Sequence, residues 1–185
     1  LKYMIDNVEP YLKEGDICII IPEYEQFYDN VAYGSEQLLR IVLDVSLSKI
    51  KTFDSNQISQ VSEFLPQYIA SKLTVQNYYK STLMNVYRHI AVNSYGDASL
   101  HWDRAHIAYP SLDKPQKAGV FNEDFYTYFV DYVNGLTSRN VTVYISFPGL
   151  QDISYNCNRE AIDGVYAHFR KSNFELLGAP EDYII

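Results

Sequence analysis

The sequence predicts a layered α/β fold with a parallel sheet, on three observations. Residues 17–21 form an unbroken apolar run, ICIII, between Gly15-Asp16 and Pro22. A short run that is apolar on both faces is typical of a strand covered on both sides. A helical pattern leads directly into this run, and helix and strand patterns alternate again over residues 121–177. We therefore expect residues 1–185 to form one α/β domain.

The first expected element is a helix over residues 1–12. One face of it carries apolar side chains at helical spacing: Leu1, Met4, Ile5, Val8 and Leu12. Pro10 is expected to kink or shorten this helix, and Gly15 suits a stop beyond its end. A helix that runs into a parallel strand is half of a βαβ unit, so the preceding strand is expected upstream of Leu1. We expect the chain to be an internal part of a longer protein, incomplete at both ends.

A helical insertion over residues 35–92 is expected after the first strand. Ser35 is a good N-cap for its first helix, and Asp54 or Ser55 can cap the second. Pro66 is expected to break or kink that second helix, and a third helical run follows over residues 73–90. Simple βαβ crossovers are much shorter, so the insertion could be a lid, a docking surface or added core.

Residues 93–120 form a long irregular segment that holds the single tryptophan, Trp102. Loops of this length inside a compact domain are usually functional or disordered. We expect this segment to pack over the carboxyl ends of the strands, which would bring Asp97 and His101 close to Glu23.

Regular α/β alternation is expected in the last third of the chain. A helix is expected over residues 121–136, followed by a strand over residues 141–147 that ends at Pro148-Gly149. Ser154 can cap the next helix, and residues 174–177 form a short last strand.

Composition narrows the possible partners. The net charge is −8 with no Lys/Arg cluster, so a nucleic-acid backbone is not an expected partner. The 18 tyrosines could cover carbohydrate rings or fill loop-rich surfaces. The two cysteines make no disulfide framework, and Cys18 is expected to be a buried structural thiol. The sequence shows no signal peptide or transmembrane span, and no cofactor is expected.

The candidate binding residues follow the first strand. Ligands of open α/β sheets bind outside the carboxyl ends of the strands, and there the chain turns abruptly to Glu23 and Tyr24. The pair Glu23 and Glu25 could do acid–base chemistry, although such pairs are also common on solvated loops.

Other constellations carry weaker signals. His101, Asp103 and His106, with Asp97 nearby, could hold a metal, but the histidines are five residues apart and a hydrogen-bonded loop is the favoured interpretation. No Gly-x-Ser-x-Gly elbow or phosphate loop occurs, and the capping role of Ser35 explains Gly34-Ser35.

Several segments, taken in order, resemble a branch of the SGNH/GDSL hydrolase-like superfamily. This branch comprises bacterial envelope proteins associated with polysaccharide genes, distantly similar to the D-alanyl transfer protein of lipoteichoic acid synthesis. The resembling segments are VEPYLKEGD (8–16) leading into IIIPEYEQFY (19–28), NSYGD (93–97) with His101, FPGLQ (147–151) and LGAPEDY (177–183).

The resemblance implies a flavodoxin-like three-layer sandwich and a serine hydrolase mechanism. A Ser nucleophile would follow the first strand, and an Asp-x-x-His pair would supply the base and its orienting carboxylate. The Ser block would precede Leu1 and the Asp-x-x-His block would follow Ile185, so no catalytic residue is assigned in this chain. Pro22-Glu23-Tyr24 stands where the family has Gly-x-Asn-Asp, a departure from its usual oxyanion hole.

The favoured hypothesis is an SGNH-like esterase or O-acyltransferase that acts on acylated polysaccharide or another small ester. The resemblance also implies a location in the bacterial cell envelope or periplasm. The expected substrate-binding residues are Glu23, Tyr24, Asp97 and His101, with no metal. The first alternative is a non-catalytic carbohydrate-binding or scaffolding domain of the same fold. Another is a helical interaction module for a membrane acyltransferase, with a membrane anchor outside this chain.

Overall fold

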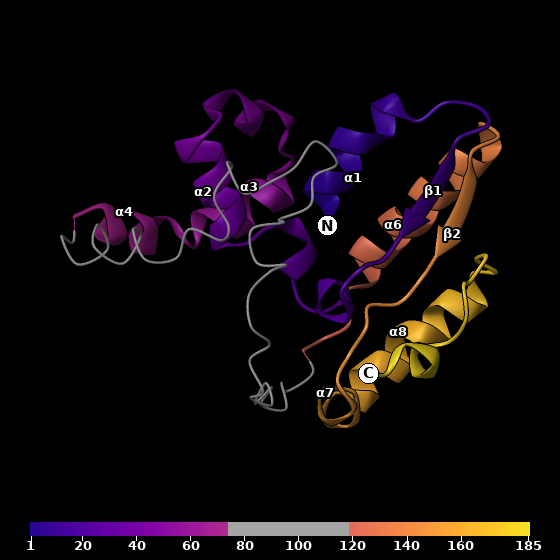
Figure 1. Ribbon diagram of the computed structural model, residues 1–185. Coiled ribbons are helices and arrows are strands. Elements are labelled where there is room, and N and C mark those ends of the chain that lie inside the picture. The colour runs from indigo at the N-terminus through magenta and orange to yellow at the C-terminus, as the bar shows by residue number, and fades with distance from the viewer. Residues whose placement is uncertain (74–118) are drawn as a thin grey trace, which may run out of the picture. The chain divides into compact units, whose positions relative to one another are not determined.

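The computed structural model describes residues 1–73 and 119–185 (Figure 1). The chain divides into two compact units, residues 1–63 with 113–185 and residues 64–112. The described part of the second unit is helix α4, Leu65–Leu73.

A small parallel sheet lies at the centre of the first unit. Strand β1, Ile17–Ile20, pairs with β2, Thr142–Ile145, in the register Ile17 to Thr142 through Ile20 to Ile145. A single parallel bridge between Ile145 and Leu176 continues the sheet beyond β2. The predicted parallel pairing is therefore confirmed, whereas the expected last strand, residues 174–177, is reduced to this one bridge.

Helices fill most of the rest of the unit. Their bounds are Lys2–Val8 for α1, Glu123–Ser138 for α6, Asp152–Cys157 for α7 and Arg159–Lys171 for α8. A 3-10 turn at Glu9–Tyr11 follows α1, so the expected shortening at Pro10 is confirmed. The side chain of Asn122 caps α6 by accepting the N–H of Phe125 (2.9 Å). Ser154 is wrong as a cap, because α7 already begins at Asp152.

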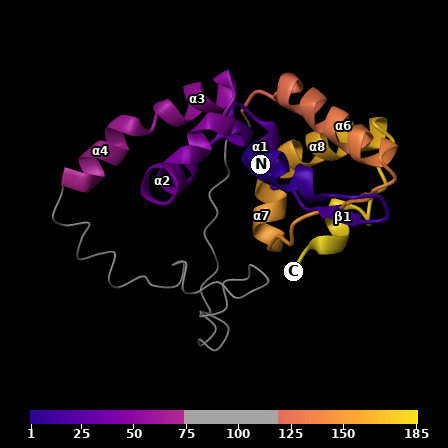
Figure 2. The same ribbon diagram turned by 90° about the horizontal axis from the view of Figure 1, so that it is seen from above.

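An aromatic core joins the helices to one face of the sheet. Phe27, which follows β1, is fully buried against Phe129 of α6 and Phe169 of α8, with ring centroids 5.4 and 5.2 Å away. Val143 and Ile145 of β2 belong to the same buried cluster. Helices α6 and α8 thus cover the same face of the sheet (Figures 1 and 2).

The opposite face of β1 is open, which corrects the expectation of a strand buried on both faces. Ile17, Ile19 and Ile21 are 65%, 55% and 56% exposed, whereas the alternate residues Cys18 and Ile20 pack against the core. Side chains alternate between the two faces of a strand, and within the described residues helices cover only one face. The described residues form an α/β structure with one helical layer on a two-stranded sheet.

The helical insertion begins as predicted. Its described elements are α2, Glu36–Asp44, a 3-10 turn at Leu47–Thr52, and α3, Ser55–Ser62. Ser35 caps α2 by accepting the N–H of Leu38 (3.4 Å), and Asp54 forms a capping box with Gln57 at the start of α3. The third helical run, after residue 73, and most of the irregular segment 93–120 lie outside the described residues.

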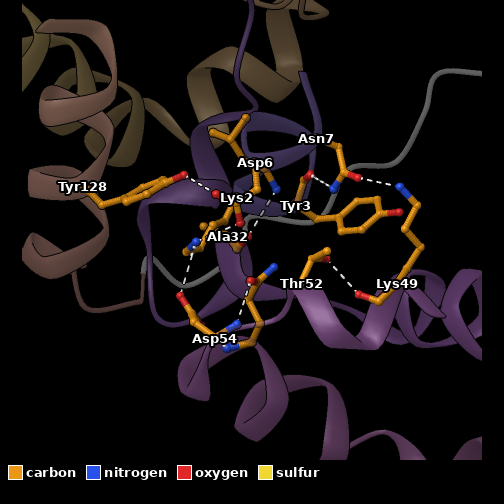
Figure 3. A network of polar contacts seen from close by, with 11 residues as sticks. Lys2, Tyr3, Asp6, Asn7, Ala32, Lys49, Thr52, Asp54 and Tyr128 are labelled. Carbon is orange, nitrogen blue, oxygen red and sulfur yellow. Dashed lines mark hydrogen bonds and ion pairs between the residues drawn. The ribbon is translucent and has the colours of Figure 1, made fainter. Parts of the chain in front are cut away.

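Two polar contacts tie the insertion to α1 (Figure 3). The Nζ of Lys2 lies 3.2 Å from Asp54 of the α3 capping box, and the Nζ of Lys49 donates to Asn7 Oδ1 (2.8 Å). On the other side, the hydroxyl of Tyr128, from α6, donates to Asp6 (2.6 Å). Helix α1 is thereby fixed between the insertion and α6.

The chain between Asp29 and Val120 leaves the core and returns to it at one point. The N–H of Asp29 donates to the carbonyl of Val120 (2.7 Å), and the N–H of Val120 donates to Asp29 Oδ1 (3.0 Å). Tyr28 and Phe121 form an antiparallel bridge directly beside these bonds.

Candidate functional site

Three segments that are distant in sequence meet at the carboxyl edge of the sheet. Tyr24, which follows β1, stacks on Phe147, which follows β2, with ring centroids 6.4 Å apart. The ring of Phe147 lies 6.0 Å from that of Tyr183, near the end of the chain. We call Tyr24, Phe147 and Tyr183 the edge aromatics.

Hydrogen bonds fix Tyr183 in place. Ser146 is buried, and its Oγ donates to the hydroxyl of Tyr183 (3.0 Å), which in turn donates to the carbonyl of Leu177. A parallel bridge between Leu150 and Ile184 holds the two loops together. The final turn, Pro180–Tyr183, is therefore attached to the exit of β2 at several points.

Tyr24 has a buried hydroxyl without a hydrogen-bond partner among the described residues. Burial is the main cause that raises the pKa of Tyr24, followed by the nearby Tyr155, Glu181 and Glu23. The phenol is therefore neutral near pH 7 and can donate, but it cannot act as an anionic base or nucleophile. A buried hydroxyl with no partner is unusual and often marks the place of a water or of a ligand atom.

A groove with a volume of about 280 Å³ lies beside β1, and Glu23 is among its lining residues. Its lining is mostly apolar and comes from α1, β1, the residues after β1, and α6: Leu1, Met4, Ile5, Val8, Cys18, Ile19, Ile20, Ile21, Pro22, Glu23, Gln26 and Tyr132. Its polar groups lie at Glu23 and Gln26 and at the Cys18–Tyr132 contact.

The cysteine in the groove is not poised for nucleophilic chemistry. Burial raises the pKa of the Cys18 thiol, although a hydrogen bond with Tyr132 opposes this shift. A reactive cysteine needs the thiolate, and reactive sites lower the pKa rather than raise it. Cys18 therefore contributes to the groove as a small apolar side chain.

The structure separates the two predicted binding residues that it describes. Glu23 is exposed and lines the groove, whereas Tyr24 is only 8% exposed and packs on Phe147. The turn Tyr24–Phe27 is a 3-10 helix, which sends these neighbouring side chains in different directions. Asp97 and His101 lie outside the described residues, as do Asp103 and His106.

Sequence reasoning missed part of this edge. The sequence pattern places Phe147 and Tyr183 within resembling segments but predicts no role for either of them or for Ser146. Pro148-Gly149 marks the carboxyl end of a strand, where ligands of open α/β sheets bind. Phe147, the residue before Pro148, is therefore a candidate site residue that the sequence pattern can indicate. The contact with Tyr183 had no local signal, because 36 residues separate it from Phe147.

Within residues 1–73 and 119–185, no group of three or more His, Cys, Asp or Glu side chains could hold a metal ion. In the same ranges, no helix has the length and apolar character needed to cross a bilayer. Comparison of the chain with protein-family models, with curated proteins and with solved structures finds no match in any of the three.

Proposed function

We propose that this chain is the core of an SGNH-like esterase or O-acyltransferase that acts on acylated polysaccharide of the bacterial cell envelope. In this proposal the fold is a flavodoxin-like three-layer sandwich, and the Ser and Asp-x-x-His blocks lie outside residues 1–185. The observation that carries the proposal is the meeting of three resembling segments, IIIPEYEQFY, FPGLQ and LGAPEDY, at the carboxyl edge of parallel strands. Ligands of open α/β sheets bind at that edge.

The groups at this edge suit a neutral, hydroxyl-bearing ligand. Glu23 is exposed and can accept hydrogen bonds from sugar hydroxyls, and half-buried Tyr183 offers an aromatic ring of the kind that covers sugar faces. Tyr24 is buried and stacks on Phe147. Asp97 and His101 are proposed to complete the substrate contacts.

The test is binding and deacylation of an O-acetylated polysaccharide by the natural polypeptide that contains residues 1–185. We expect binding of the acetylated polymer, release of acetate, and about tenfold weaker binding for Glu23→Gln, because a hydrogen bond to a charged group is lost. Glu63→Gln, an exposed site at the end of α3, is the matched control. Failure to bind the polymer would refute the proposal, and binding without acetate release would favour the non-catalytic carbohydrate-binding alternative.

The 185-residue chain by itself is expected to be inactive on a small activated acetyl ester. A serine hydrolase needs its nucleophile and base within hydrogen-bond reach, and the proposal places both blocks outside this chain. Turnover above background that disappears in His101→Ala or His106→Ala would instead place the chemistry in the segment 93–120.

A further inference from the structure

Strand β1 has one edge that no described strand occupies. The carbonyls of Asp16 and Ile20 accept the N–H groups of Thr142 and Ser146, each at 2.9 Å. In a parallel ladder, every second residue directs both its N–H and its C=O toward the same neighbouring strand. The backbone groups of Asp16, Cys18 and Ile20 therefore point toward β2. Ile17, Ile19 and Ile21 therefore direct their N–H and C=O groups to the opposite edge, where the described residues supply no pairing strand.

The groove lies along this unpaired edge. Residues 18–22 form one of its walls, α1 forms another, and Tyr132 of α6 closes it toward the core. An unpaired strand edge is a template for another strand, and an apolar groove beside it gives alternate side chains of that strand a place to pack. The groove thus offers backbone donors and acceptors and apolar pockets together.

Helix α1 sets the direction of a strand in this groove. The helix begins near the carboxyl end of β1, because the backbone nitrogen of Leu1 donates to Gln26 Oε1 (3.0 Å). It ends near the amino end of β2, where Glu9 pairs with Arg139 (3.3 Å). Helix α1 therefore runs antiparallel to β1, as the helix of a βαβ unit does.

The handedness of the connection that α1 would make between such a strand and β1 also agrees with the rule for parallel strands. Helix α1 shares the buried core with α6, through Ile5, and contacts α6 at Tyr128 (Figure 3). Consider a strand at the free edge of β1 that is connected to β1 by α1. This connection would have the same handedness as the connection from β1 through α6 to β2. Crossovers between parallel strands are almost always right-handed, so this position satisfies the rule.

We propose that the groove is filled by an apolar β-strand that runs parallel to β1, pairs with Ile17, Ile19 and Ile21, and enters α1 directly. Its source is the polypeptide joined to residue 1 in the natural protein. A second copy of this chain would instead bring its own β1 edge across a two-fold axis, in antiparallel orientation. This proposal and the function proposed above both place polypeptide before residue 1, but amide exchange tests the strand and binding and deacylation of the polymer test the function.

Amide hydrogen exchange of the natural polypeptide tests the pairing. We expect the amides of Ile17, Ile19 and Ile21 to exchange at least about a hundredfold more slowly than unprotected amides, at every protein concentration. Cys18 and Ile20, whose amides face β2, are the internal controls. Free exchange at Ile17, Ile19 and Ile21, or protection that arises only as dimers form, would overturn the proposal.

Removal of the polypeptide before residue 1 identifies the source of the strand. Protection of Ile19 should then be lost while that of Ile20 is kept, and Cys18, which lines the groove, should become more reactive toward a soluble thiol reagent. Exposed Cys157 is the control thiol, whose reactivity should not change. Protection of Ile19 that survives the removal would overturn the proposal; if the shortened protein does not fold, the exchange pattern of the natural polypeptide decides.

Discussion

The two strands of the sheet have different surroundings, although both are apolar. β2 pairs with β1 on one side and with Leu176 on the other, and its Val143 and Ile145 are buried. Within residues 1–73 and 119–185, β1 has one paired edge, and its Ile17 and Ile19 are exposed. The more apolar strand is thus the less buried one. An apolar composition allows a strand to be buried, but whether it is buried depends on which elements lie beside it.

The largest expected difference between the strands is the loss of folding stability when a charged side chain replaces an isoleucine. Ile145→Asp places an unpaired carboxylate in the core and should cost at least about 4 kcal/mol, whereas Ile19→Asp should cost about 1 kcal/mol or less. Urea denaturation of both variants measures the two costs. Equal destabilisation would mean that β1 is covered on both faces after all.

The difference in stability cost between the two strands should disappear for the residues that follow them, because both segments enter the aromatic core. Phe27 after β1 and Phe147 after β2 are both buried. Each substitution to Ala is expected to cost about 3–5 kcal/mol, because it removes a large buried ring and leaves a cavity. The free energies of unfolding provide the check, with Tyr11→Ala on the exposed turn after α1 as the control. A cost below 1 kcal/mol at Phe27 would place β1 and its exit outside the core.

High pH should weaken the β1 side of the core. Burial and the neighbouring Cys18 raise the pKa of Tyr132, so the folded protein favours the neutral phenol. The resulting stability is present below the ordinary tyrosine pKa of 10.0 and is lost as the pH rises above it. Thermal melting between pH 8 and about 11 should show a fall in Tm that Tyr132→Phe reduces. An unchanged slope in the variant would mean that other tyrosines carry the effect.

The smallest expected effects concern the caps of the insertion. Asp54→Ala removes a capping box and should cost about 1 kcal/mol, whereas Ser35→Ala removes a longer bond and should cost less. Thermal melting of the two variants provides the measurement. The reverse order would show that the capping box of Asp54 contributes less to stability than the single bond of Ser35.

Sequence reasoning succeeded where the signal was local. The caps at Ser35 and Asp54 and the shortening at Pro10 each depend on a few adjacent residues. It failed for the open face of β1, because the composition of a strand does not state how many layers cover it. It also failed to separate Glu23 from Tyr24, since only the 3-10 turn that follows directs one outward and the other into the core.

The point where the insertion joins the core has a consequence for folding and for engineering. Asp29 and Val120 touch although 91 residues separate them, so the core forms only after a long loop has closed. Closure entropy grows with the logarithm of loop length, so a connector of about four residues in place of this excursion would lower the closure cost by about 3 kcal/mol. The contacts of α1 with the insertion, such as Lys2 with Asp54, would be lost in exchange. A minimised protein of this kind should collapse faster, and it would isolate the sheet and its aromatic core as a single cooperative unit.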